Sequence, residues 1–161
     1  MRVSSFLAAA GLLAVALPGV AAAQGADNCS QAQPIAGVGL FAFNNTSATT
    51  AGPQACGNFG RDVWWSWVAP TTANYQVSTC GLASWDTTLG IYVGSCPNPT
   101  EVTCNDDTCG LQSTVSWSAM AGTTYLIRGG SFSGSSSGSG QIEIALGGSG
   151  GGGCMNPATG P

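Results

Sequence analysis

The chain has 161 residues, with 7 acidic residues, 3 lysines and arginines, no histidine and a formal net charge of −4. So few cations cannot neutralise a phosphate backbone or an anionic bilayer surface, which excludes nucleic acid and the membrane as expected partners. Without histidine, a Ser–His–Asp or Cys–His catalytic arrangement is excluded as well.

The first residues have the pattern of a secretory signal peptide. Arg2 gives a positive start, an apolar run follows from Phe6 to Val20, and the small residues AAA at 21–23 form a cleavage signature. An apolar run of about 15 residues is too short to span a bilayer. We therefore expect residues 1–23 to be a signal peptide and the mature protein to be secreted, extracellular or at the cell surface.

Beyond the signal, short runs of alternating apolar and polar residues are separated by Gly, Pro, Asn and Ser clusters. No apolar pattern of helical period appears. Short strands at such spacings are typical of sandwiches and jelly rolls, so we expect an all-β, antiparallel jelly-roll-like β-sandwich over residues 24–146. In chain order the expected strands are Leu40–Phe43, Asp62–Val68, Tyr75–Cys80, Thr87–Val93, Glu101–Cys104, Thr114–Ala119, Thr123–Arg128 and Gln141–Leu146.

Two segments of low complexity lie beside the last of these strands. Gly129–Gly140 (GGSFSGSSSGSG) predicts a hairpin loop before it. Residues 147–161 (GGSGGGGCMNPATGP) cannot form a core element and predict a Gly-rich flexible tail.

The 7 cysteines all follow the predicted signal peptide, where an oxidising compartment favours disulfide bonds. A zinc site would need His or paired Cys-x-x-Cys knuckles, and neither is present. Spacing leaves the connectivity open, and Cys154 in the tail is the candidate for the odd thiol. As a hypothesis we take the bridges Cys29–Cys56, Cys80–Cys109 and Cys96–Cys104, the last of which would close a short Pro-containing hairpin.

The stretch Val102–Gly110 (VTCNDDTCG) places Asn105, Asp106 and Asp107 in one turn. Carboxylate and amide oxygens suit calcium, and Asp86 would join them if the two loops share an end of the sandwich. The alternative is ordinary turn chemistry, in which short Asn and Asp side chains cap backbone N–H groups. Both a calcium site and a metal-free turn remain open at this point.

The tryptophans suggest a surface that could stack on a sugar. Consecutive Trp64 and Trp65 must point to opposite faces of their strand. We assign Trp65, Trp67 and Trp117 to the core. The candidate ligand platform consists of Trp64, Trp85 and Tyr92, for which packing under a loop is the alternative.

Several motifs in a fixed order resemble those of one family. They are DVWWSWVAP from Asp62 to Pro70, then ANYQVSTCG, SWDTTLGIYVGSC, VTCNDDTCG and AGTTYLIRGG. Together they are similar to the bacterial pre-peptidase C-terminal domain family. The resemblance implies an exported, jelly-roll-like, non-catalytic domain associated with secretion, folding or attachment to an insoluble substrate. It also implies that Asp86 lies near the Asn-Asp-Asp turn. This chain departs from the family's usual setting because no enzyme domain accompanies the module.

We therefore expect a secreted binding, adhesion or secretion-accessory module that is not an enzyme. Its expected partners are an extracellular polysaccharide or a protein surface. One alternative is a carbohydrate-binding module that uses exposed aromatic side chains, and another is a structural spacer of a larger surface protein. Catalysis would require a glycosidase-type carboxylate pair, for which a domain of this size offers little room.

Overall fold

The computed structural model describes residues 24–53, 58–134 and 136–147. A single turn of 3-10 helix, η1 (Cys29–Gln31), is followed by nine strands in this part of the chain. They are β1 (Gln33–Ile35), β2 (Gly39–Asn44), β3 (Phe59–Val68), β4 (Ala73–Ser78), β5 (Thr87–Val93), β6 (Thr100–Asn105), β7 (Thr114–Ala119), β8 (Thr124–Phe132) and β9 (Ser139–Leu146). The predicted signal peptide, Cys56, Cys154 and the predicted tail beyond residue 147 lie outside the described residues.

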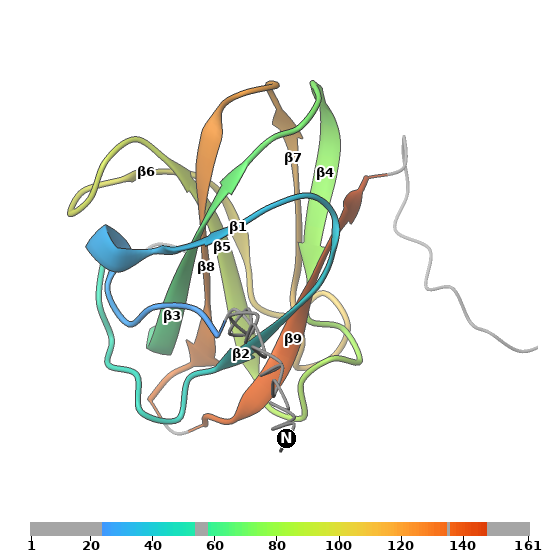
Figure 1. Cartoon of the computed structure of the whole chain (residues 1–161). Coiled ribbons are helices and arrows are strands. Elements are labelled where there is room, and N and C mark those ends of the chain that lie inside the picture. Colours follow the sequence, from blue (N-terminus) through green and yellow to red (C-terminus); the bar gives the residue numbers. More distant parts are fainter. Residues whose placement is uncertain (1–23, 54–57, 135, 148–161) are drawn as a thin grey trace, which may run out of the picture.

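The strands form two sheets packed face to face (Figure 1). One has the order β1-β3-β8-β5-β6 and the other the order β2-β9-β4-β7. If β2 is counted as strand 1 and β9 as strand 8, the sheet β2-β9-β4-β7 has the order 1-8-3-6. The strands β3-β8-β5-β6 of the other sheet have the order 2-7-4-5. This is the strand order of a jelly roll. Only β1 departs from the antiparallel pattern, since it pairs in parallel with β3 at the sheet edge. The predicted jelly-roll-like sandwich is confirmed.

The main core lies between the sheets and is dominated by aromatic rings. Trp65 and Trp67 of β3 are fully buried, and Trp117 of β7 is nearly so, as the sequence predicts. The ring centroids of Trp67 and Trp117 lie 5.8 Å apart in an edge-to-face arrangement, and those of Trp67 and Tyr75 lie 4.8 Å apart. Such pairs add to the free energy gained from burying the rings themselves.

Strand β8 continues through Phe132, where the sequence predicts the start of a loop. The glycines there mark close packing. A Cβ at Gly130 would lie 2.7 Å from the carbonyl oxygen of Arg61, and one at Gly129 would lie 3.1 Å from the Trp65 ring. Because neighbouring atoms occupy the space of a side chain, the glycines belong to the sheet. The bounds predicted for β5 and β7 agree with the structure.

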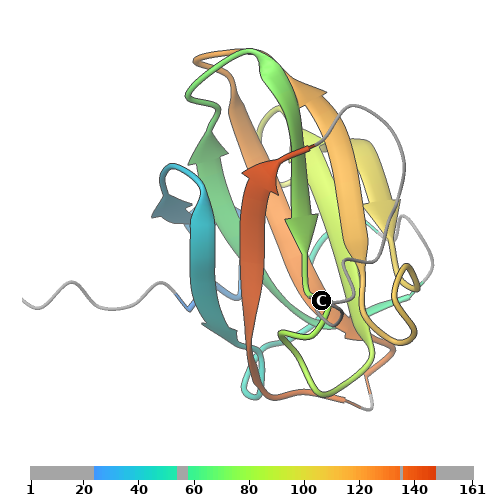
Figure 2. The same ribbon diagram turned by 90° about the vertical axis from the view of Figure 1, so that its right-hand side faces the viewer.

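The two sheets differ in what covers their outer faces. Residues 27–32 and 49–53, which we call the cover, pack against the outer face of the five-stranded sheet at β3 (Figure 1). Within the described residues, no element lies over the outer face of the sheet β2-β9-β4-β7, which is turned toward the viewer in Figure 2.

Candidate functional site

The acidic turn lies where the sequence predicts, beside the start of β5. Asp86 immediately precedes β5, and Asn105 ends the neighbouring strand β6, where it pairs with Leu89. Burial raises the pKa of the Asp86 carboxyl, and the negative charges of Asp107 and Asp106 raise it further. The structure therefore brings Asp86 within electrostatic reach of both turn carboxylates.

Hydrogen bonding separates the roles of these side chains. The Asn105 Oδ1 accepts hydrogen bonds from the Thr108 hydroxyl at 2.5 Å and the Thr114 backbone N–H at 3.4 Å. Asn105 thus performs the turn chemistry that the sequence offered as the alternative. In contrast, the Oδ1 of Asp86 is buried and has no hydrogen-bond partner among the described residues.

A buried hydroxyl cluster supports the turn from beneath. The hydroxyls of Thr79 and Thr87 lie 2.7 Å apart. The Ser113 Oγ lies within hydrogen-bond distance of the Thr87 carbonyl oxygen, at 2.5 Å, and the Asp106 carbonyl oxygen, at 3.0 Å. These contacts fix the backbone of the acidic turn to the start of β5. Even so, no three His, Cys, Asp or Glu side chains within the described ranges are arranged to hold a metal ion.

The disulfides confirm one predicted bridge and correct two. Cys80 is bonded to Cys109, as predicted, and this bond ties the end of β4 to the loop that follows the acidic turn. Cys29 is bonded to Cys96 across 67 residues, so the predicted Cys29–Cys56 and Cys96–Cys104 bridges are wrong. Cys104 is also disulfide-bonded.

The physical reason for the correction is the position of the cover. The predicted pairing used proximity along the chain, whereas η1 lies over the same region of the sheet as the loop after β5. Cys29 and Cys96 both pack there, against the cluster formed by Trp64, Tyr92 and Leu126. The bond therefore fastens the cover to the sheet.

The same cover removes most of the predicted aromatic platform. Trp64 and Tyr92 each have 0% of their surface exposed, so the expectation that they are exposed is wrong. Their ring centroids lie 5.4 Å apart in a second small core on the outer face of the five-stranded sheet. Trp85 is half-buried and packs edge-on against Phe43 at 5.6 Å. Trp64 and Tyr92 have no open face on which a sugar could stack.

This second core encloses an ion pair that the sequence does not reveal. The Arg128 Nη2 lies 2.7 Å from the Asp62 Oδ2, and both side chains are fully buried. Asp62 also accepts a hydrogen bond from the Trp64 Nε1 at 3.0 Å, and Arg128 donates to the Pro53 carbonyl at 2.6 Å. The guanidinium lies 3.9 Å from the centre of the Phe59 ring. Burial raises the pKa of Asp62, although Arg128 acts against that shift.

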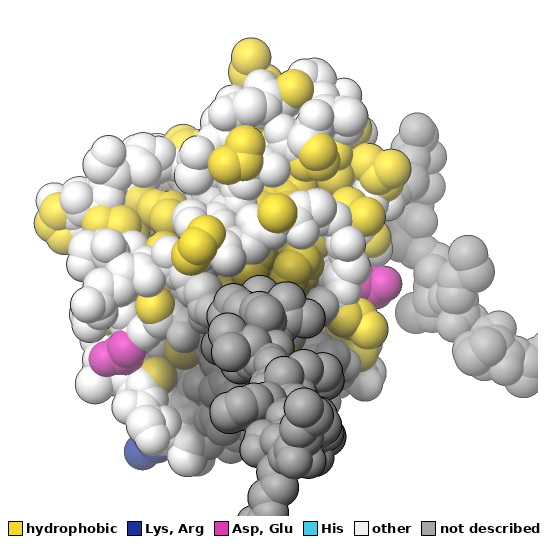
Figure 3. Space-filling model, viewed as in Figure 1, with side chains coloured by type: hydrophobic (Ala, Val, Ile, Leu, Met, Phe, Trp, Pro, Cys, Tyr) yellow, Lys and Arg dark blue, Asp and Glu magenta, His cyan; other side chains and the backbone are white. Residues whose placement is uncertain are grey.

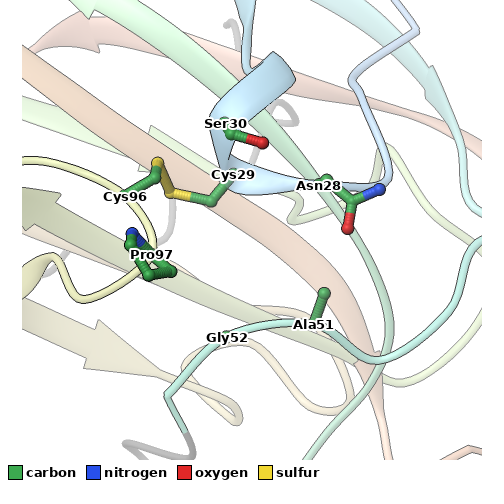
Figure 4. Close-up of a pocket in the computed structure, with 7 residues that line it drawn as sticks. All are labelled: Asn28, Cys29, Ser30, Ala51, Gly52, Cys96 and Pro97. Carbon is green, nitrogen blue, oxygen red and sulfur yellow. A yellow bond between two sulfur atoms is a disulfide. The ribbon is translucent and has the colours of Figure 1, made fainter.

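A small hollow opens at the surface of the cover (Figure 4). Its volume is about 120 Å³, enough for a few water molecules. The Cys29–Cys96 bridge and Pro97 form one side, and Asn28 and Ala51 form the other. It is far too small to enclose a polymer. The full lining is Asn28, Cys29, Ser30, Ala51, Gly52, Cys96 and Pro97.

No protein-family model and no curated protein matches the chain. Within the described residues, no helix has the length and apolar character required to cross a membrane. The disulfide bonds indicate that the protein matures in an oxidising compartment.

Proposed function

We propose that this chain is a secreted, non-catalytic module that attaches to an extracellular polysaccharide or protein surface, the role that its resemblance to pre-peptidase C-terminal domains implies. One observation carries the proposal. The outer face of the five-stranded sheet is covered by residues 27–32 and 49–53, which a disulfide fastens, whereas no described element covers the outer face of the four-stranded sheet (Figure 2). As far as the described residues go, the side chains of this face are available for contact with a partner.

Charge supports a weakly charged partner and a non-catalytic role. Charged side chains are few and scattered over the face seen in Figure 3. The chain has no histidine or lysine, and Asp62, one of its few carboxylates, is held in the buried pair with Arg128. Groups that transfer protons or attack a bond at neutral pH are correspondingly scarce.

The experiment is a retention assay with the secreted, oxidised protein on insoluble polysaccharides and on fibrous protein. Retention on at least one surface, without hydrolysis of it, is the expected result. A folded protein that no surface retains would favour the structural spacer instead. Secretion is tested separately, by N-terminal sequencing of exported protein, which we expect to begin at Gln24.

Calcium is a second proposal, supported by Asp86. A buried carboxylate oxygen without a hydrogen-bond partner, near two further carboxylates, is the kind of environment that a hard cation stabilises. Because the three carboxylates are not arranged to hold an ion as they stand, Asp86, Asp106 and Asp107 would have to turn toward one another to supply oxygens, with backbone carbonyls completing the set. Asn105 contributes only if its hydrogen bonds with Thr108 and Thr114 break.

A further inference from the structure

The outer face of the four-stranded sheet is mainly polar, as one solvated face of an antiparallel sheet commonly is. Along β4 and β7 the side chains alternate, so that Tyr75, Val77 and Trp117 enter the core while their neighbours point outward. We use the term polar face for six polar side chains that point outward from this sheet. They are Asn74 and Gln76 on β4, Ser116 and Ser118 on β7, and Gln141 and Glu143 on β9.

Part of the polar face is free to bind. The Ser118 hydroxyl donates a hydrogen bond to the Asn74 Oδ1 at 2.7 Å, so these two side chains satisfy each other. The side chains of Gln76, Gln141 and Glu143, together with that of Ser116, make no hydrogen bond or ion pair with any other described residue. Their donors and acceptors are available to a partner.

Three of the free groups, those of Gln76, Ser116 and Glu143, lie close together across the sheet, and Gln141 is two residues farther along β9 from Glu143. Gln76 stands opposite Ser116 on β7 and opposite Ala145 on β9. Glu143 is two residues from Ala145 on the same face, which makes it a diagonal neighbour of Gln76, at about 7–8 Å between Cα atoms. Adjacent strands about 4.8 Å apart thus present an amide, a hydroxyl and a carboxylate within one small area.

Charge and hydrogen bonding together select the partner. Glu143 is the charged residue of the polar face, and Arg61 and Arg128 both lie in the other sheet, so an anionic polymer meets no cation there. Amides and hydroxyls both donate and accept hydrogen bonds, and a carboxylate accepts them. A partner rich in hydroxyl groups and without charge satisfies all of these groups.

Apolar contact is available beside them. Leu40 of β2 stands opposite Glu143 and is 54% exposed. Sugar rings combine hydroxyl edges with C–H faces, so a chain of such rings could use both kinds of contact. We propose that the polar face binds a neutral polysaccharide chain through Gln76, Gln141, Ser116 and Glu143, with Leu40 at its side. This inference rests on the proposed function and specifies its partner.

The test uses the oxidised secreted protein with cellulose as the neutral polysaccharide, a calcium-free alginate gel as the anionic one and collagen fibres as the protein surface. We expect retention on cellulose, and about tenfold weaker retention for Gln76→Ala combined with Gln141→Ala, because two hydrogen-bonding groups are lost. Glu143→Gln, which preserves shape and removes charge, should retain at least part of the binding.

A matched control is Gln31→Ala, since Gln31 is an exposed glutamine on η1, at the opposite sheet. It should bind as the parent protein does, and near-ultraviolet circular dichroism should show that every variant is folded. Equal retention of parent and double variant on cellulose overturns the inference. Retention on collagen or alginate but not on cellulose overturns it too, while the proposed function of attachment survives. Retention on none of the three overturns both.

Discussion

Arg128 and Asp62 form an ion pair with both side chains fully buried, between the outer face of the five-stranded sheet and the cover. Their closest atoms, Nη2 and Oδ2, are 2.7 Å apart, although 66 residues separate them in sequence. Removing two charges from water is costly, and such a pair is tolerated only when hydrogen bonds satisfy the groups. Here the Trp64 Nε1 donates to Asp62 and the Pro53 carbonyl accepts from Arg128, while the buried Arg128 Nε has no hydrogen-bond partner among the described residues.

Arg128→Met should destabilise the protein severely, by about 3–5 kcal/mol, because it leaves the Asp62 carboxylate buried without its partner. Guanidinium chloride unfolding measures the change. Arg61→Met is the control, since Arg61 lies on the same sheet and is half-buried, and it should cost much less. Adding Asp62→Leu to Arg128→Met should restore part of the stability, because no lone charge then remains buried. Equal losses for the two arginine variants would contradict the assigned role.

Period-two patterns were sufficient to predict most strands and the sandwich, because one face of each strand enters a common core. They failed for the outer face of the five-stranded sheet. On β3 both faces are buried, so alternation carries no information about which tryptophan is outside, and Trp64 was assigned to the wrong environment. The short β1, with Pro34 at its centre, gave no signal at all.

The disulfide that fastens the cover joins residues that are distant in sequence. The Cys29–Cys96 bond spans 67 residues, and no local spacing distinguishes it from the alternatives. The acidic turn was easier to predict, because Asn105 accepts its hydrogen bonds from residues no more than nine positions away. Local chemistry was therefore predictable, as was the Cys80–Cys109 bond, whereas the long-range bond that fastens the cover was not.

Stability should increase as the pH is lowered from neutral toward the ordinary carboxyl pKa values of 4.5 for Glu101 and 3.8 for Asp86, in buffer with chelator. Burial raises the pKa of Glu101, and burial with two neighbouring carboxylates raises the pKa of Asp86. A folded-state pKa above the unfolded-state pKa means that the folded protein binds protons more tightly. At pH values above the folded-state pKa, ionisation of each group therefore lowers the free energy of unfolding. This loss of stability disappears as the pH falls toward the pKa that the group has in the unfolded state. Thermal unfolding midpoints across this range measure the effect.

Asp86→Asn should remove part of that pH dependence and raise the midpoint at pH 7, because the amide carries no charge to bury. Asp27→Asn serves as the comparison, since the Asp27 carboxylate accepts hydrogen bonds from Thr49 and its loss should lower the midpoint. A midpoint for Asp86→Asn below that of the parent at pH 7 would show that the ionised carboxylate has a stabilising partner.

Calcium, if it binds at the acidic turn, should raise the unfolding midpoint by several degrees relative to chelator. A ligand selective for the folded state stabilises it by mass action, by about 2.7 kcal/mol at a concentration one hundred times the Kd. Asp86→Ala and Asp107→Ala should each abolish the shift, whereas Glu143→Ala, on the outer face of β9, should preserve it. An identical midpoint with calcium and with chelator would leave the turn as a metal-free structure.

Replacing both Cys29 and Cys96 by serine should loosen the cover and expose Trp64 without unfolding the sandwich. The bridge packs directly on the Trp64–Tyr92 cluster, so its loss should cost about 2–4 kcal/mol and increase acrylamide quenching of tryptophan fluorescence. Adding Trp64→Phe should remove most of the increase and assign it to that residue. Replacing Cys80 and Cys109 instead should destabilise the acidic end and leave Trp64 protected, because that bond lies away from the cover. Equal quenching in the two cysteine variants would contradict a specific role for the Cys29–Cys96 bond in holding the cover.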